Sequence, residues 1–194
     1  AVKKLKAKNT ADHCLIGVDT LVNPGQLLVS HPKLNDGLFS KSVVLITEHH
    51  INGSVGFILN KPSNYKMRDV VEENMLGIMQ DETLYSGGPL NTGSLILIHS
   101  GEWYSSNTLA LPDNISISSD HFMFEKISMG NIPFNYKLVT GISGWQPNQL
   151  ESELTNQNWL VTNPTEDLIY NHAGVTMWRK ALELCASQVV ASYF

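Results

Sequence analysis

The most constraining feature of this sequence is the stretch 42–62, SVVLITEHHINGSVGFILNKP, which predicts two strands joined by a tight turn. The unbroken apolar run 43–46 is typical of a strand that is covered on both faces. Asn52-Gly53 is a strong hairpin signal, because both central positions of a type I′ turn require positive φ. Residues 55–59 return as a second apolar strand. We therefore expect a hairpin that is buried on both faces.

Patterns outside the hairpin predict the remaining elements. Apolar runs predict strands at residues 26–30, 94–99, 137–142 and 159–161, with one or two short strands within the loop 100–120. Helical spacing and capping signals predict helices at 11–22, 66–76, 122–128, 147–154 and 174–190, and a brief helix after Thr165. Turns are expected at residues 23–25, 36–37, 86–89 and 143–145.

The order of these elements indicates the fold class. Neighbouring strands are interspersed with scattered helices and do not alternate strictly with them. This order favours an α+β fold with one mixed or mainly antiparallel sheet flanked by helices. A regular doubly wound fold is the alternative.

Length and composition are those of one globular domain. The chain has 194 residues, of which 42% are hydrophobic and 16% charged, enough for a substantial core. We assign residues 25–194 to a single domain and residues 1–24 to a partly mobile N-terminal extension. No apolar run approaches the roughly 20 residues of a membrane helix, so we expect no membrane contact.

The charge distribution argues against direct nucleic-acid binding. The net charge is -5, and Lys3, Lys4, Lys6 and Lys8 supply four of the 13 basic residues. Without them, nine basic residues face 18 acidic ones. An acidic body repels phosphate, whereas nucleic-acid affinity comes mainly from basic surface. The lysine-rich segment either is a solvated terminus or contacts an acidic partner.

The cysteines favour a reducing compartment. Cys14 and Cys185 lie near opposite ends of the chain, and neither has a neighbour at metal-ligand spacing. We expect a cytoplasmic protein, or an organellar one if a targeting segment has been removed, since the chain does not begin with Met.

Three motifs carry a resemblance to a known family. They are Glu48-His49 with Gly53, Gly56 and Asn60-Lys61-Pro62; Gly87-Gly88-Pro89; and Gly141-Ile142-Ser143-Gly144-Trp145 followed by Gln149-Leu150-Glu151-Ser152-Glu153. Their order and spacing resemble the AlgH/YqgE family of small, largely uncharacterised proteins over about residues 25–190. The resemblance implies a single α+β domain and no particular reaction. Asn148 departs from the family pattern, which has Gly there, but Asn also tolerates left-handed geometry.

One branch of this family carries the label transcriptional regulator. The present chain has no helix-turn-helix signature and no basic face. We therefore expect any regulatory role to act through a protein partner.

The motifs also suggest where a site would lie. We expect it in a groove shared by the hairpin, the glycine turn at 87–89 and the helix start after Trp145. Its candidate residues are Glu48, His49, Asn60, Gly87, Gly88, Pro89, Gly144, Trp145 and Gln149. We assign no catalytic residue, cofactor or metal; His49 and His50 are adjacent on a strand and so point to opposite faces.

Two functional hypotheses follow. The favoured one is a non-enzymatic regulatory or binding module that acts through a protein partner, with its oligomeric state open. The alternative is a small-molecule-processing, hydrolase-like enzyme that uses Glu48 and His49, because a Glu-His pair can be tuned near neutral pH. This alternative requires His49 inside a concave pocket, within hydrogen-bond reach of a carboxylate other than Glu48. Ser143 is no nucleophile elbow, since Trp145 occupies the final glycine position.

Overall fold

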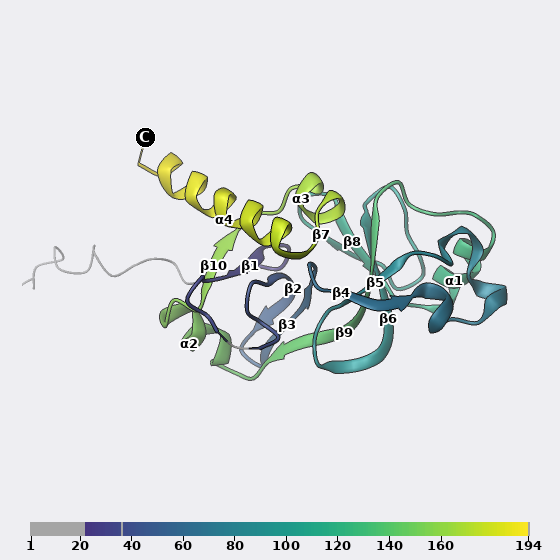
Figure 1. Cartoon of the computed structure of the whole chain (residues 1–194), viewed down its shortest axis with the longest axis horizontal. Coiled ribbons are helices and arrows are strands. Elements are labelled where there is room, and N and C mark those ends of the chain that lie inside the picture. Colours follow the sequence, from purple (N-terminus) through teal and green to yellow (C-terminus); the bar gives the residue numbers. More distant parts are fainter. Residues whose placement is uncertain (1–21, 36, 194) are drawn as a thin grey trace, which may run out of the picture.

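The computed structural model describes residues 22–35 and 37–193 as a curled sheet with helices on both faces (Figure 1). The strands are β1 Leu27–Ser30, β2 Val43–His50, β3 Gly53–Ile58, β4 Pro62–Lys66, β5 Thr83–Ser86, β6 Leu90–Ser100, β7 Leu109–Leu111, β8 Ile115–Ser118, β9 Tyr136–Trp145 and β10 Trp159–Thr162. The α-helices are α1 His121–Ser128, α2 Gln149–Thr155, α3 Glu166–Asn171 and α4 Gly174–Ala191. Three single 3-10 turns, η1 Met67–Asp69, η2 Glu73–Met75 and η3 Gly77–Met79, follow β4.

The sheet is mainly antiparallel. Its strands run in the order β10-β1-β2-β3-β9-β6-β8-β7, and β4 pairs with β5 beside this path. The pairing of β5 with β9 is parallel, and the other pairs are antiparallel. The predicted α+β fold is confirmed, and the doubly wound alternative is wrong because the strands return as neighbours without helical crossovers.

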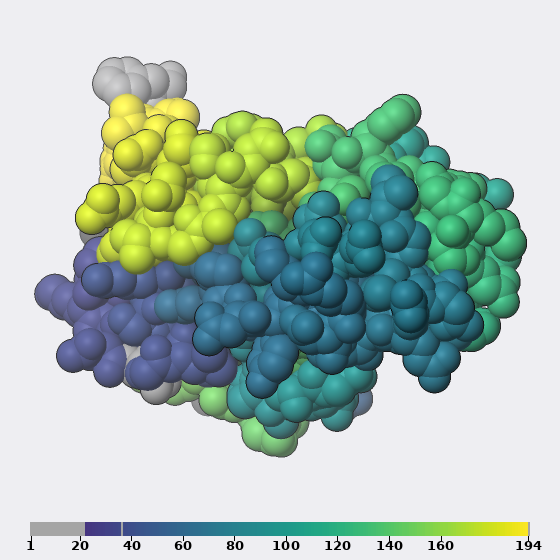
Figure 2. Space-filling view, turned by 45° about the vertical axis from the view of Figure 1, so that its right-hand side comes forward, coloured from purple at the N-terminus to yellow at the C-terminus, as the bar shows by residue number. Residues whose placement is uncertain are grey.

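The first half of the sheet is covered on both faces, as the apolar run predicted. Val43 and Leu45 belong to a core beneath α3 and α4, whereas Val44 and Ile46 belong to a second core beneath α2. This is the period-2 alternation of a strand with helices on either side. In Figure 1, α4 crosses one face of β1, β2 and β10, and α2 lies below them. Figure 2 shows the yellow-green α4 packed against the purple N-terminal part of the chain.

A third core fills the other end of the sheet, and here one predicted helix is wrong. Residues 66–76 form the end of β4 and separate 3-10 turns. Two of their apolar side chains still point inward, because Met67 and Leu76 are buried against α1, whereas Val70 is exposed. Two β-branched valines in succession, Val70-Val71, disfavour a continuous helix. Gly77, the first residue of η3, has φ +51°, which is incompatible with a regular right-handed helix through this position.

Two predicted turns differ from the structure. The hairpin loop is Ile51-Asn52, closed by the pair of His50 with Gly53, and of these residues Gly53 alone has positive φ, at +122°. The turn is therefore not type I′. A side chain at Gly53 would lie 2.4 Å from the Trp145 carbonyl oxygen, so the neighbouring strand determines this position.

That neighbouring strand is longer than predicted. Residues 143–145 continue β9 and pair with residues 54–56 of β3, because β3 pairs with β9 beyond the end of β5.

Other predicted elements are confirmed: α2 follows Asn148, which has φ +64°, and Thr165 caps α3. The described part begins at Val22, which is buried in the second core. The predicted helix at 11–22 and the Asp36-Gly37 turn fall largely or partly outside the described residues. No helix in the described ranges is long and apolar enough to cross a membrane.

The Gly87-Gly88 segment crosses β9 at backbone contact distance. A Cβ added at Gly88 would lie 2.3 Å from the Ile142 carbonyl, and one added at Gly141 would lie 2.3 Å from the Gly88 oxygen. The Gly87 oxygen accepts bonds from the Ile58 amide at 2.9 Å and from the Ser143 hydroxyl at 2.9 Å. The glycines are thus required because two backbones meet there without side chains between them.

We expect Gly88→Ala to lower the free energy of unfolding by about 2 kcal/mol or more, because it combines a backbone clash with strain at φ +154°. The matched control is Gly93→Ala, since a Cβ at Gly93 meets nothing within 4 Å and its φ is not positive. We expect the control to change stability by less than about 0.5 kcal/mol. Urea unfolding measures both, and equal effects would contradict this account.

Lys137 is a buried cation beneath the α3–α4 connection. It is 4% exposed, and its Nζ donates to the Leu59 and His172 carbonyl oxygens, each at 3.0 Å. The ammonium also lies 4.3 Å from the centre of the Tyr85 ring. Among the described residues it has no carboxylate partner. Burial without an anion lowers the pKa of Lys137 to about 8.

This pKa predicts that Lys137 contributes stability that rises with pH. Between pH 8 and about 10.5 the unfolded chain keeps the Lys137 proton while the folded chain releases it, so the contribution of Lys137 to the free energy of unfolding increases. The full effect is on the order of 3 kcal/mol. Cys185 contributes in the opposite direction, because burial raises the pKa of its thiol to about 11. We expect the stability of Lys137→Met to have a less positive pH slope than that of the wild type, and Lys33→Met, at an exposed position, to have the wild-type slope. Urea unfolding at pH 7, 8, 9 and 10 measures the slopes, and a slope shared by all three proteins would refute the assignment.

Candidate functional site

His49 lies at the hairpin end of β2 and faces the start of α2. Its Nδ1 shares a 2.7 Å hydrogen bond with the Ser54 hydroxyl across the hairpin. Its Nε2 lies 3.8 Å from the Glu151 carboxylate, which is an ion-pair distance and too long for a hydrogen bond. His50 points the other way, 3.8 Å from exposed Glu48. The expected opposition of the two histidines is confirmed.

Beside His49, one carboxylate holds an aromatic cluster together. Glu153 accepts bonds from the indole nitrogens of Trp145 at 3.0 Å and Trp159 at 2.7 Å. Its second oxygen accepts from the Gln149 amide at 2.9 Å. The two indole rings meet edge to face at 6.2 Å, and Phe39 packs against both. The third motif therefore joins β9, α2 and β10.

The sequence indicated only part of this cluster. Trp145 and Gln149 were candidates, whereas Glu151 and Glu153 were named only as part of the third motif. The roles of Glu153 and Trp159 were missed. The available signal was a glutamate eight residues after one tryptophan and six before another. The sequence does not show that these three residues meet, because their contact depends on the pairing of β10 with β1.

The remaining candidates lie in the framework. Asn60 is fully buried; its side chain accepts from the Val43 amide and donates to the carbonyls of Lys41 and Gly174. Gly87 and Gly88 form the backbone crossing already described, with exposed Pro89 after them. Gly144 pairs with Val55 in the sheet. The structure thus brings His49, Trp145 and Gln149 together, and it uses Asn60 and the glycines as internal supports.

A groove opens along the N-terminal half of β6. We call it the β6 groove; its volume is about 440 Å³. Its apolar lining residues are Phe57, Val70, Val71, Leu95, Ile96, Ile117, Phe124 and Ile142, and its small or hydroxyl-bearing ones are Thr92, Gly93, Ser94, Ser119 and Thr140. No lining residue is titratable. The groove can therefore hold an uncharged, largely apolar group, but it supplies no acid or base.

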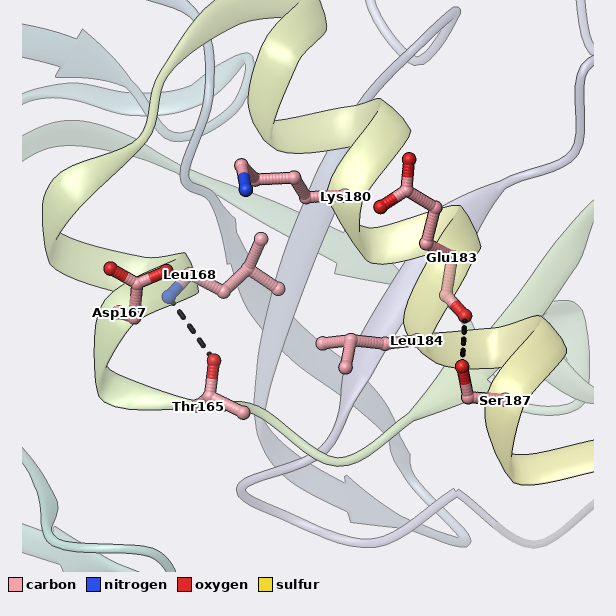
Figure 3. Close-up of a pocket in the computed structure, with 7 residues that line it drawn as sticks. All are labelled: Thr165, Asp167, Leu168, Lys180, Glu183, Leu184 and Ser187. Atoms are coloured by element: carbon pink, nitrogen blue, oxygen red, sulfur yellow. Dashed lines mark hydrogen bonds between the residues drawn. The ribbon is translucent and has the colours of Figure 1, made fainter. Parts of the chain in front are cut away.

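A second, smaller concavity lies between α3 and α4 (Figure 3), with a volume of about 250 Å³. Its walls carry charge, from Asp167 on α3 and from Lys180 and Glu183 on α4. Asp167 is already engaged, because bonds from Asn171 and His172 lower the pKa of its carboxyl. Thr165 and Ser187 bond to the backbone of their own segments, as the dashed lines in Figure 3 show.

The requirement for an enzyme built on Glu48 and His49 is not met by these concavities. His49 lines neither of them, and its closest carboxylate beyond Glu48 is the 3.8 Å contact with Glu151. Within residues 22–35 and 37–193, no three His, Cys, Asp or Glu side chains converge to hold a metal ion.

Fold and site together define a class of protein: an α+β domain whose mainly antiparallel sheet carries an uncharged groove along β6. Comparison with known sequences identifies the family. The model of the AlgH-like family matches residues 27–190, and the chain belongs to this family. This finding confirms the resemblance carried by the three motifs.

Individual relatives agree. A UPF0301 protein of Marinomonas sp. is 33% identical over 150 residues, which cover 74% of this chain and 79% of that protein. A UPF0301 protein of Agrobacterium fabrum is 31% identical over 169 residues, covering 82% and 84%. These names describe no activity.

Solved structures show the same fold. The solution structure of the AlgH protein from Pseudomonas aeruginosa superposes with a TM-score of 0.71 at 22% identity, covering 83% of this chain and 87% of that one. The crystal structure of protein DIP2367 from Corynebacterium diphtheriae gives a TM-score of 0.67 at 25% identity, covering 81% and 84%.

We expect Glu153→Leu to lower the free energy of unfolding by about 2–4 kcal/mol, because it leaves two indole N–H groups unpaired in a buried setting. Glu151→Leu, on the same helix, is the control and should change stability by less than about 1 kcal/mol. Urea unfolding followed by tryptophan fluorescence reports both. Similar losses in the two variants would show that Glu153 is not the residue that joins the cluster.

Proposed function

We propose that this protein is a non-enzymatic regulatory or binding module that acts through a protein partner, and that the partner contacts the β6 groove. The single observation that carries the proposal is the lining of that groove, which is concave and apolar and has no titratable side chain. Binding sites are typically concave and apolar with a few hydrogen-bonding groups, and the hydroxyls of Thr92, Ser94 and Thr140 supply such groups here.

The use of the motif side chains supports the same proposal. The side chains of three motif residues, Glu153, Asn60 and Ser143, form hydrogen bonds within the fold and so stabilise it. The acidic charge balance disfavours a direct contact with nucleic acid. Any effect of the protein on transcription would then pass through the partner, and we expect this to happen in the cytoplasm.

The test is site-specific photo-cross-linking of the full chain in cells that naturally produce it. A photoreactive phenylalanine analogue replaces Ser94, in the groove, or Lys33, an exposed residue that does not line it. We expect a discrete polypeptide adduct from position 94 and none from position 33. The two adduct patterns are compared by mass spectrometry.

Three results would contradict the proposal. They are no adduct at position 94, the same adducts at both positions, or an adduct at position 94 whose added mass is that of a metabolite. The last result would assign the groove to a small molecule.

A further inference from the structure

The β6 groove lies where β6 has no neighbouring strand on the β8 side, among the described residues. Strand β6 runs from Leu90 to Ser100, but β8 pairs only with its last four residues, Leu97–Ser100. The chain turns away after Ser118 and enters α1 through its cap, Asp120. Along the side where β8 would continue, residues 90–96 of β6 have no strand partner within the described ranges.

The lining of the groove shows that this open edge faces into it. Five consecutive residues of β6, Thr92–Ile96, line the groove. A strand that is seen from one face presents only every second side chain, so an unbroken run indicates an exposed edge. Ile117 and Ser119 line the groove as well, which places its beginning where β8 stops.

The other side of β6 is also irregular here. Leu90 pairs with Ile142 of β9 and the next pair is Leu95 with Thr140, so four residues of β6 stand opposite one of β9. Asn91, at φ +48°, begins this bulge. Neither β8 nor β9 therefore pairs with residues 91–94 of β6. Bulges commonly interrupt pairing at sheet edges.

We infer that the partner of the proposed module binds by strand addition: an extended, uncharged segment of the partner polypeptide pairs with residues 92–96 of β6, in line with β8. This inference rests on the proposed function and names the form of its ligand. Main-chain bonds to an open edge provide affinity in this mode, and alternate side chains enter pockets.

The groove determines the composition of that segment. Inward side chains would meet Phe57, Ile96 and Ile117, which are at least 93% buried and form an apolar floor. A charged side chain would lose its hydration there with no ion-pair partner among the lining residues. The segment is therefore apolar at alternate positions and lacks charge, with room for hydroxyls near Thr92 and Ser94.

The test selects ligands from a random ten-residue peptide library displayed on phage, with the full chain as bait. The selected peptides are then synthesised, and their dissociation constants are measured by fluorescence anisotropy. We expect uncharged sequences with alternating apolar residues. N-methylation of alternate peptide amides should weaken binding at least tenfold, because it removes main-chain donors without changing side chains.

A matched pair of variants locates the contact. A Cβ built at Gly93 or at Gly37 meets nothing within 4 Å, and neither residue has positive φ, so the backbone tolerates a side chain at both positions. We expect Gly93→Trp, in the groove, to weaken peptide binding at least tenfold and Gly37→Trp, elsewhere, to leave it unchanged. Hydrogen exchange should slow at residues 92–96 when the peptide binds.

The outcomes separate this inference from the proposed function. Strand addition is overturned if no peptide is selected, if charged peptides dominate, if N-methylation has no effect, or if Gly93→Trp binds as the wild type does. In each of these cases a polypeptide cross-linked at position 94 would still leave the proposed function standing. If that cross-link is also absent, both are wrong.

Discussion

The backbone crossing of Gly87-Gly88 over β9 is the contact on which the two halves of the molecule depend. β9 pairs with β5 and then with β3 along one side, and the glycine segment passes between these two partners. The Gly87 oxygen accepts bonds from β3 and from β9 at the same place. Because a side chain at either glycine would overlap the backbone of β9, the exchange of partners requires Gly-Gly.

Polar groups join the layers on both sides of the crossing. Glu153 fixes α2 to two tryptophans from different strands, and Asn60 fixes the end of β3 to β2 and to the start of α4. Lys137 joins the same strand end to the α3–α4 connection, without an anionic partner among the described residues. Each group carries more than one hydrogen bond, as buried polar groups in folded proteins do. These residues, two of which belong to the motifs, thus make their bonds within the fold, which explains why conspicuous residue types need not mark chemistry.

Local patterns predicted the elements whose environment is local. The run Val43–Ile46 is buried on both faces, and Thr165 caps α3, as its sequence indicates. Predictions failed where a distant segment decides the conformation. The apolar residues of 66–76 have helical spacing as a set, but Met67 and Leu76 enter a core that α1 completes. The hairpin position 53 has no room for a Cβ because Trp145 of β9 lies against it. In the candidate site, Trp145, Gln149 and His49 could be grouped from the motif. Glu153 bonds to both tryptophans only because β10 pairs with β1 and so brings Trp159 beside α2.

The β6 groove illustrates the same limit. No motif marks it, since it arises from the difference between an eleven-residue strand and its four-residue neighbour. An open edge of this length is a hazard for a protein unless it is covered, bulged or used. Here the bulge at residues 91–94 interrupts the edge, and hydroxyl side chains line its rim. These features limit unspecific pairing but leave five consecutive residues facing an apolar floor. A strand edge that a bulge interrupts, but that still has unpaired residues beside an apolar floor, is the arrangement that a selective strand partner would require.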